Sequence, residues 1–377
     1  TLLSLTKTFI YTPFTPEERL MPNAHTPITH MHREALQASD MLKGQLANIK
    51  HTTALVDAIK ALNPSTFITV ARGSSDHAAH YFAYLVMQKL GILTVSLPPS
   101  LVTLHHAPLK VSSSVAFGFS QSGASPDLVD TLTHLGEHGA HTIACVNQTN
   151  SALEQAADLS WAIDAGQELS VAATNSCLGI MTLAAQFVAV WQDDQPLLDA
   201  LLSLVDRFAH PAQSAPNRVL DVFGAAKRVF VIGRGLSHSI ALEAALKMKE
   251  TCAIQSEAFS VAEVRHGPMR LIEANYPVVV FITPGPEQQQ LIDFSIEMRA
   301  RGAHVLAVCA TDTDALDSLT RAGVMILDAH TGTAPFCSTL APMAALQCFY
   351  VFLSELAQHR GMDPDRPLYL NKVTQTH

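Results

Sequence analysis

The sequence predicts an α/β fold built from two tandem, doubly wound parallel-sheet domains. The chain has 377 residues, which is long for one hydrophobic core when domains usually contain about 100–200 residues. Hydrophobic residues make up 48% and charged residues 15% of the chain, enough to bury two large cores. Short apolar runs alternate with amphipathic stretches, and this order occurs twice along the chain. Alternation of this kind is typical of parallel sheets covered by helices.

The first copy contains the clearest strand and helix signals. Apolar positions at helical spacing over residues 32–62 predict a helix that ends at Asn63-Pro64-Ser65. The β-branched run Thr66–Ala71 predicts a strand, Arg72-Gly73-Ser74-Ser75-Asp76 a tight turn, and residues 77–90 an amphipathic helix. The remaining elements expected in this copy are strands at 91–95, 114–119 and 141–146 and a helix at 126–137.

Two pairs of motifs reveal the repeat. Arg234-Gly235-x-Ser237 follows Arg72-Gly73-x-Ser75 by 162 residues, and Gly302-Ala303-His304 follows Gly139-Ala140-His141 by 163. Two matches at nearly one offset indicate a duplicated α/β domain. A helical connector over residues 197–222, broken at Pro211 and Pro216, is expected to join the copies.

These patterns predict four segments. Residues 1–45 form an N-terminal arm and helix, of which 1–30 are loosely ordered because of four prolines. Residues 46–200 form the first domain, residues 215–355 the second domain, and residues 356–377 a tail that carries Lys372.

The bulk composition excludes several classes of protein. A net charge of −9 argues against binding to nucleic acid, so any anionic ligand needs a local site. The six cysteines form no Cys-x-x-Cys pair, which fits a reducing cytoplasm. No apolar stretch reaches the length of a membrane helix, and the N-terminus lacks the pattern of a signal peptide. We therefore expect a cytoplasmic protein without a nucleic-acid or membrane partner.

The first copy carries a candidate phosphate loop. Ser120-Gln121-Ser122-Gly123-Ala124-Ser125-Pro126 closes a predicted strand and opens a predicted helix, where free backbone N–H groups and the helix dipole hold anions. An ordinary capped turn is the alternative. The similar turn Gly73-Ser74-Ser75 favours phosphate, because turns at neighbouring strand ends converge. The second copy has Thr283-Pro284-Gly285-Pro286 instead, which suggests that one half binds phosphate and the other supplies something else.

The second copy carries candidate acid/base groups. Glu243, Lys247 and Glu250 share one face of a predicted helix, and His266 lies in the loop that follows. A helix-surface charge pair and an ordinary loop histidine are the alternatives. The neighbouring alanines at 241, 244 and 245 favour close packing of this helix. An acid/base pair in this place suits proton transfer.

Other polar clusters are weaker candidates. His77 and His80 lie one helical turn apart, but no third ligand follows at a recognisable spacing, so we expect no metal site. The aspartates at 312, 314 and 317 are interpreted as a helix start with a solvated face. Lys372, read without context, is a lysine that solvates the end of a chain.

From about Met31 to the C-terminus, the chain resembles the tandem SIS (sugar isomerase) proteins. It is similar to the isomerase half of glucosamine-6-phosphate synthase and to SIS-type glucosamine-6-phosphate deaminases. Besides Ser120-Gln121-Ser122-Gly123, the resemblance rests on five motifs: Gly233-Arg234-Gly235; the run from Ala241 to Glu250; Glu257-Ala258-Phe259; Glu263-x-x-His266-Gly267-Pro268; and Asp365-x-Pro367-x-x-Leu370-Asn371-Lys372. The resemblance implies two flavodoxin-like SIS domains.

The resemblance also implies roles for individual residues. Glu250 would move a proton between C1 and C2, and Lys247 would position the open-chain sugar. His266, supplied by the neighbouring subunit of a homodimer, would open the sugar ring, and Lys372 would approach the open-chain carbonyl. The residues implied to bind the substrate or its phosphate are Gly73, Ser74, Ser75, Ser120, Gln121, Ser122, Ser125, Val171 and Asn371. No metal or organic cofactor is implied.

The expected function is deamination of glucosamine 6-phosphate to fructose 6-phosphate and ammonia. The sequence shows no amidotransferase domain before the repeat, which turns the expectation from synthesis toward deamination. Asn175 stands where relatives usually have lysine, which leaves the identity of the sugar open. The alternatives are another phosphosugar aldose–ketose isomerase and a non-catalytic sugar-phosphate-binding regulator. Glu250, His266 and Lys372 together favour an enzyme, since a regulator needs no proton-transfer groups.

Overall fold

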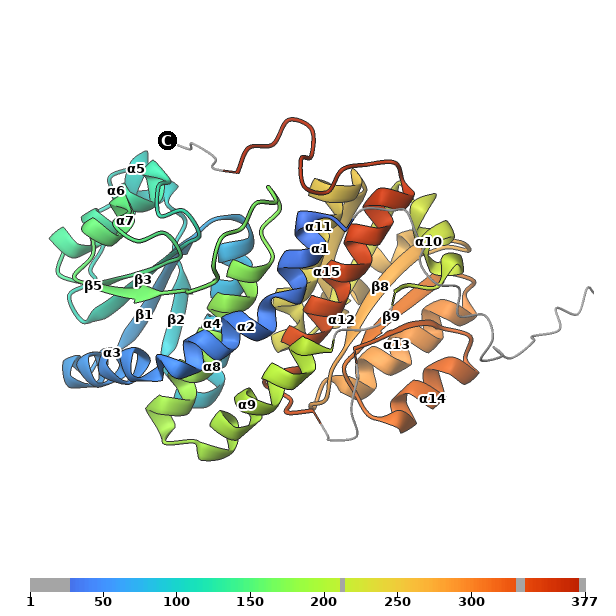
Figure 1. Cartoon of the computed structure of the whole chain (residues 1–377), viewed down its shortest axis with the longest axis horizontal. Coiled ribbons are helices and arrows are strands. Elements are labelled where there is room, and N and C mark those ends of the chain that lie inside the picture. Colours follow the sequence, from blue (N-terminus) through green and yellow to red (C-terminus); the bar gives the residue numbers. More distant parts are fainter. Residues whose placement is uncertain (1–27, 211–213, 330–335, 373–377) are drawn as a thin grey trace, which may run out of the picture.

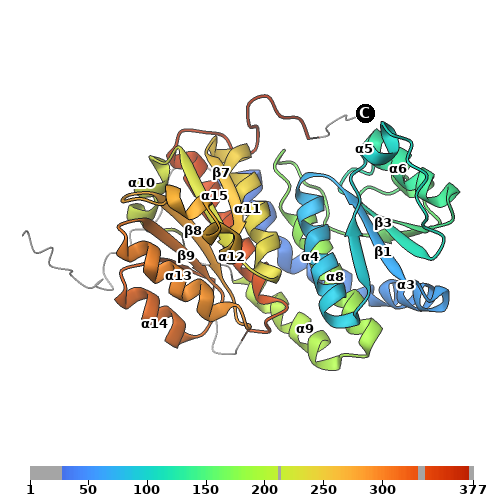
Figure 2. The same ribbon diagram turned by 180° about the vertical axis from the view of Figure 1, so that it is seen from behind.

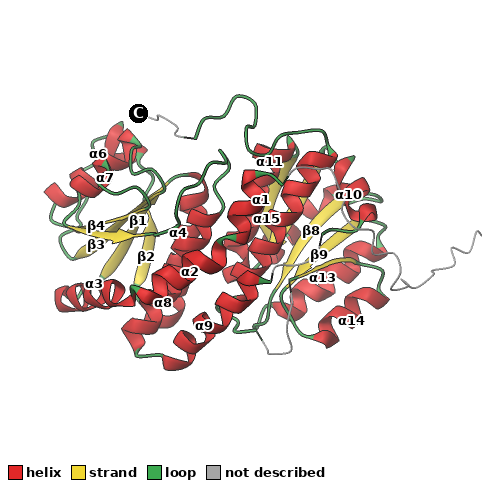
Figure 3. Cartoon of the chain, viewed as in Figure 1, coloured by secondary structure: helices red, strands yellow, loops and turns green. Residues whose placement is uncertain are grey.

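A computed structural model describes residues 28–210, 214–329 and 336–372 (Figure 1). Nearly all of the predicted arm at residues 1–30 lies outside these ranges, and so does the predicted break at Pro211. Two sheets, one in each repeat, stand on opposite sides of a central layer of helices (Figures 1 and 3). The predicted α/β architecture of two parallel sheets is confirmed.

The first sheet has the strand order β2-β1-β3-β4-β5, and all of its strand pairs are parallel. Its strands are β1 (Thr66–Ala71), β2 (Leu93–Ser96), β3 (Ser114–Ser120), β4 (His141–Val146) and β5 (Leu159–Ala162). The chain leaves β1 toward β2 on one side and returns as β3 on the other. The carboxyl ends of β1 and β3 therefore form the switch point at which doubly wound sheets bind ligands.

The second sheet repeats this topology with the order β10-β9-β8-β6-β7. Its strands are β6 (Arg228–Gly233), β7 (Gln255–Ser260), β8 (Pro277–Ile282), β9 (His304–Cys309) and β10 (Met325–Asp328). Here β6 and β8 correspond to β1 and β3, so the second switch point lies between them. The predicted duplication therefore extends to the order of the strands.

Helices cover both sheets and join them. Around the first sheet lie α3 (Ile49–Leu62), α4 (Gly73–Leu90), α5 (Ser100–Thr103), α6 (Pro126–Glu137), α7 (Ala152–Gln155) and α8 (Asn175–Gln192). Before this sheet in the chain come α1 (His30–Leu36) and α2 (Ala38–Ala47), and after it come α9 (Gln195–Ala209) and α10 (Asn217–Gly224). The second repeat contributes α11 (Leu236–Cys252), α12 (Val261–Arg265), the 3-10 turn η1 (Pro268–Leu271), α13 (Gln288–Ala300), α14 (Thr313–Arg321) and α15 (Ala341–His359).

The central layer holds the repeats together. Helices α4 and α11 pack against each other, as do α11 and α15 (Figure 2), and α1 packs against α15 (Figure 1). One apolar core runs from the inner face of the first sheet through this layer to the second sheet. The alanines Ala241, Ala244 and Ala245 are almost completely buried on α11, which confirms the close packing expected there. Because α4 and α11 start at the two switch points, their contact brings the ends of β1 and β6 together.

The structure corrects three details of the sequence analysis. Residues 32–62 do not form one helix, because the chain turns at Gln37 and Asn48 into separate helices. Gly73-Ser74-Ser75 is not a free turn but the first turn of α4. The predicted domain boundaries at 45, 200 and 355 fall inside α2, α9 and α15.

No helix in the described part of the chain is long and apolar enough to cross a membrane.

Candidate functional site

The candidate phosphate loop lies between β3 and α6, at the first switch point. Ser120 Oγ accepts a hydrogen bond from Gly123 N (3.0 Å), and Ser122 Oγ accepts one from Ala124 N (3.3 Å). Gly123 has a φ of +60°, which lets the chain turn tightly after the strand. Ser125 is the N-cap of α6, but its side chain makes no capping hydrogen bond. Its hydroxyl therefore remains available to a ligand at the start of α6.

Lys247 joins the two repeats at the start of α4. Its Nζ donates hydrogen bonds to Ser74 Oγ (2.8 Å) of α4 and to Glu250 Oε2 (2.6 Å) one turn farther along α11. Only 1% of the Lys247 side chain is exposed, against 22% for Glu250. The structure thus brings together Ser74, Lys247 and Glu250, which the sequence placed in different domains. The Lys247–Glu250 pair is not the solvated surface pair considered as an alternative.

Glu243 anchors the buried side of this cluster. Its Oε1 lies 3.5 Å from Lys247 Nζ and accepts a hydrogen bond from Tyr350 OH (3.0 Å). Its Oε2 lies 2.9 Å from Nδ1 of His77 on α4. Each oxygen of this buried carboxylate therefore has a partner, as a charge in a protein interior requires.

The charges of the cluster stabilise one another. Burial raises the pKa of Glu243, but Lys247 and His77 outweigh this effect and lower it to about 2. Burial also lowers the pKa of Lys247, but Glu243 and Glu250 outweigh it and raise that pKa above its usual value. Lys247 is therefore a fixed cation, while the partly exposed Glu250 is the member of the cluster that a ligand can reach.

Lys372 lies in the C-terminal tail and contacts the loop that precedes α8. Its Nζ donates a hydrogen bond to Ser170 O (2.6 Å) and lies 3.7 Å from Glu168 Oε2. Glu168 is buried and accepts hydrogen bonds from Thr174 N, Ser176 N and Ser176 Oγ at the start of α8. The tail lysine is therefore bound to the body of the protein and does not simply solvate the end of the chain.

Cys177 links the two charged groups in space. Burial raises the pKa of its thiol well above the usual range, and the nearby charges of Glu243, Lys247 and Glu168 also act on it. Both the α11 cluster and the Glu168–Lys372 pair are therefore close to the first turn of α8.

Arg72 places a further positive charge at the carboxyl end of β1. Its Nε (2.9 Å) and Nη2 (2.8 Å) both contact Asp127 Oδ2 in the first turn of α6. Asp127 is 1% exposed, whereas 51% of the Arg72 side chain is exposed. The pair ties the turn after β1 to the helix after β3, and so fixes the two candidate phosphate-binding segments relative to each other.

Several predicted residues lie apart from this cluster or make other contacts. His266 is exposed at the end of α12, and within the described chain no hydrogen bond or ion pair joins it to Glu250. Asn371 is exposed, and Val171 N donates to Asp365 O (3.1 Å). Asn175 is buried and donates to Ala165 O (2.8 Å), so this position supports the loop before α8.

The second switch point is filled by a side chain of the protein. A cavity of only about 50 Å³ lies there, next to Arg234 and Thr283. The Glu287 carboxylate packs across two glycine Cα atoms, so that a Cβ on Gly235 would lie 2.7 Å from its Oε1 and one on Gly285 3.1 Å from its Oε2. A carboxylate in this place repels a phosphate, which agrees with the expected asymmetry of the repeats.

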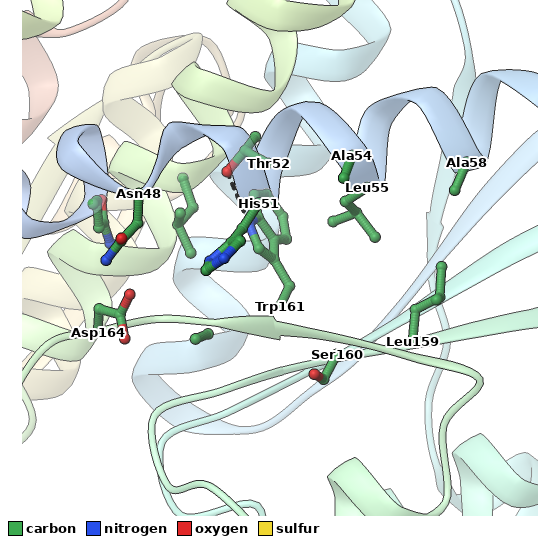
Figure 4. Close-up of a pocket in the computed structure, with 13 residues that line it drawn as sticks. Asn48, His51, Thr52, Ala54, Leu55, Ala58, Leu159, Ser160, Trp161 and Asp164 are labelled. Carbon is green, nitrogen blue, oxygen red and sulfur yellow. Dashed lines mark hydrogen bonds between the residues drawn. The ribbon is translucent and has the colours of Figure 1, made fainter.

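A groove of about 480 Å³ lies away from these residues. It runs between α3 and the edge strand β5, with Asn48, His51 and Asp164 near one end and Ala58 and Leu159 near the other (Figure 4). Thr52 Oγ1 accepts a hydrogen bond from Trp161 Nε1 (3.2 Å) in its wall. None of the predicted site residues lines it, so we do not assign the chemistry to this groove.

His77, which was considered with His80 as a weak metal candidate, is paired through its Nδ1 with Glu243. Within the described residues, no group of three histidine, cysteine, aspartate or glutamate side chains could hold a metal ion.

Sequence reasoning did not assign to this site several residues that shape it. These are Arg72 with Asp127, His77 and Tyr350 around Glu243, and Glu168 with Glu34 around Lys372 and its loop. Asp365 was noted only as part of a tail motif. Among these residues, only Asp127 could have been recognised in the sequence, because it directly follows Pro126 at the end of the candidate phosphate loop. The other partners come from distant parts of the chain.

A family model agrees with the duplicated fold. The SIS domain model matches residues 62–190 and again residues 223–352. Each match contains one of the two sheets. Among solved structures, a provisionally assigned phosphosugar isomerase from Silicibacter pomeroyi DSS-3 is 31% identical, with a TM-score of 0.81. The match covers 90% of this chain and 100% of that one.

Two other proteins place this similarity in context. The isomerizing glutamine–fructose-6-phosphate aminotransferase of Aquifex aeolicus is 29% identical over 357 residues. This match covers 93% of the chain but 57% of that protein, so the chain spans little more than half the length of this relative. A glucosamine-6-phosphate deaminase from Thermotoga maritima shares the fold with a TM-score of 0.70 at 19% identity, over 92% of this chain and 98% of that one.

Proposed function

The chain belongs to the SIS-domain family, and on this premise we propose that it is a phosphosugar isomerase-type enzyme that deaminates glucosamine 6-phosphate. One observation carries the proposal. Lys247 Nζ bonds to both Ser74 and Glu250, and so couples the phosphate-binding edge of one repeat to an acid/base group of the other. The isomerase assignment of the Silicibacter pomeroyi relative supports the reaction class.

The reaction begins with phosphate capture and ring opening. The turn at Gly73-Ser74-Ser75 and the loop with Ser120, Gln121, Ser122 and Ser125 hold the phosphate through hydroxyl and backbone N–H groups. His266 from a second copy of the chain protonates the ring oxygen. Lys372 then donates a hydrogen bond to the aldehyde oxygen at C1, while Val171 and Asn371 line the sugar.

Glu250 carries the proton transfer. Its carboxylate removes the hydrogen at C2, the electron pair forms a C1–C2 double bond, and O1 takes up the proton that the C2 ammonium gives up. The nitrogen lone pair then forms a C2–N double bond as Glu250 delivers to C1 the same proton, or one exchanged with solvent. The product carries an imine at C2. Water adds to this imine, and the C–N bond breaks to give fructose 6-phosphate and ammonia. Lys247 stays protonated and orients Glu250 throughout.

The charge at the carbonyl end favours an amino sugar over a neutral one. Glu243 and Glu250 flank Lys247, while Glu168 and Glu34 both lie close enough to Lys372 to interact with its charge. Four carboxylates therefore face two ammonium groups and the His77 imidazole. An ammonium on C2 of the substrate would balance this excess, whereas a hydroxyl would not.

The test is incubation with a panel of hexosamine 6-phosphates and neutral hexose 6-phosphates, followed by assays of ammonia and ketose phosphate. Ammonia released in equal amount with fructose 6-phosphate supports the deaminase. Interconversion of the neutral sugars without ammonia would instead indicate an aldose–ketose isomerase. Binding without any turnover would overturn both and indicate a regulator.

A further inference from the structure

Helix α1, which precedes the first repeat, is bound to the C-terminal tail. The Asp365 carboxylate accepts hydrogen bonds from His30 N (2.7 Å) and Met31 N (2.7 Å). Thr29 Oγ1 and Ser354 Oγ lie 2.8 Å apart and join the start of α1 to α15. Segments more than 300 residues apart in sequence therefore form one unit.

Glu34, on the same helix, holds the loop before α8. Its Oε1 accepts hydrogen bonds from Leu169 N and Ser170 N, while its Oε2 is buried without a hydrogen-bond partner. The residue is only 4% exposed. Burial raises the pKa of this carboxyl, whereas the charge of Lys372 lowers it.

Ser170 receives contacts from both of these segments. Its N–H points to Glu34, its O accepts the hydrogen bond from Lys372 Nζ (2.6 Å), and its Oγ donates to Pro364 O (3.4 Å). The next residue, Val171, donates its N–H to Asp365 O (3.1 Å). Residues 163–174 contain no helix or strand, so these contacts set where the loop lies.

We propose that Glu34 is a positioning residue for Lys372 and acts through Ser170. A lysine ammonium sits on a flexible four-carbon stem, so its place depends on the group to which it bonds. The Ser170 carbonyl is that group, and Glu34 fixes the peptide next to it. This inference rests on the role proposed for Lys372 at the substrate carbonyl.

Loss of Glu34 should affect the chemical step more than substrate capture. Without the carboxylate, two N–H groups of the loop lose their acceptor and the loop shifts. A displacement of about 1 Å at a reacting group can cost about 100-fold in rate. The phosphate loop belongs to β3 and α6 and does not contact Glu34, so KM should change little.

The experiment compares three variants. Glu34→Ala removes the acceptor, whereas Glu34→Gln keeps an amide oxygen in the place of Oε1 and puts its NH₂ where Oε2 has no partner. Ser39→Ala is the matched control. Ser39 lies on the neighbouring helix α2, is also 4% exposed, and donates a hydrogen bond to the distant backbone oxygen of Val205. Thermal unfolding confirms that each variant is folded.

Two measurements are made on the folded proteins. Ammonia release from glucosamine 6-phosphate gives kcat and KM. Brief acetylation, with peptides quantified by mass spectrometry, gives the reactivity of Lys372, with the exposed Lys43 as the internal reference. The second measurement needs no substrate, so it tests the link from Glu34 to Lys372 even if the proposed function fails.

We expect Glu34→Ala to lower kcat by about 10- to 100-fold with little change in KM, and to speed acetylation of Lys372 but not of Lys43. Glu34→Gln and Ser39→Ala should both stay close to the wild type. Unchanged Lys372 acetylation in Glu34→Ala would overturn the inference, as would equal acceleration in Ser39→Ala. Faster acetylation without ammonia release by the wild type would support the link and reject the deaminase.

Discussion

Lys247 Nζ lies 2.6 Å from Glu250 Oε2 and 3.5 Å from Glu243 Oε1, so a buried ammonium stands between a buried and a partly exposed carboxylate. The three side chains occupy successive turns of α11, as their spacing in the sequence requires. Because α11 packs against α4, the cluster also reaches Ser74 and His77 of the first repeat. One helix thus supplies the candidate site with a fixed charge and with the carboxylate proposed as its acid/base group.

Glu243 should make the free energy of unfolding depend on pH in the acid range. Glu243→Gln leaves Lys247 with one carboxylate fewer and should lower the free energy of unfolding at pH 7 by about 3 kcal/mol. Urea unfolding of the variant and the wild type measures the difference.

The sign of the pH dependence follows from the pKa of Glu243, which falls from its ordinary value of 4.5 to about 2 on folding. The ionised carboxylate stabilises the wild type above pH 4.5, and this contribution is lost as the pH drops toward 2. The difference between the two proteins should therefore shrink between pH 4.5 and 2. A gap that stays constant over this window would contradict the assignment.

Ser122→Ala should weaken phosphate binding more than it slows the reaction. Removal of one hydroxyl donor from the loop should raise KM by about 10-fold, equivalent to roughly 1.4 kcal/mol, while kcat falls less than about threefold. Inhibition by inorganic phosphate should weaken in parallel. Ser203→Ala, at an exposed position on α9, serves as the control. Unaltered KM and phosphate inhibition would remove this loop from the site.

Gly123→Ala should distort the phosphate loop. The added Cβ would lie 2.2 Å from Ser151 Oγ, and the φ of +60° already disfavours a side chain. We expect a loss of about 1–3 kcal/mol in stability together with a raised KM. Gly91→Ala is the matched control, because Gly91 has a φ of +69° but nothing within 4 Å of its Cβ. If both variants lose the same stability and keep their KM, the close contact at Gly123 has no role.

His266 and Glu250 should complement each other between subunits. His266→Asn and Glu250→Gln are each expected to be inactive alone. In a dimer with shared sites, a hybrid of the two variants contains one site with both groups intact, so co-expression should restore about a quarter of the wild-type activity. Absence of recovery in hybrid dimers that have been isolated would place both groups in the same subunit.

Local patterns in the sequence predicted most of the fold. The helix Pro126–Glu137 and the strand His141–Val146 have the bounds that periodicity and turn residues indicated. The break at Gln37 escaped prediction, because α1 packs on α15 and α2 on α9, and neither contact is visible in the local pattern. Gly73 could be recognised as part of the turn after a strand, but not as the first residue of a helix.

The site was predictable only where its residues lie close in sequence. Lys247 and Glu250 are three residues apart on one helix, so their pairing follows from helical geometry. The contacts of Asp365 with His30 and of Glu243 with Tyr350 join segments separated by 335 and 107 residues. Such pairs depend on how the repeats pack, and no spacing in a single sequence encodes them.

Glu250→Gln in deuterated water tests the central claim most directly, namely that Glu250 transfers a proton on a sugar phosphate held by the first repeat. The wild type should convert glucosamine 6-phosphate to ammonia and fructose 6-phosphate that carries some solvent deuterium at C1. Glu250→Gln should bind the substrate with similar affinity by calorimetry, yet lose at least about 100-fold in turnover. Deuterium at C1 and near-normal turnover in the variant would contradict the account.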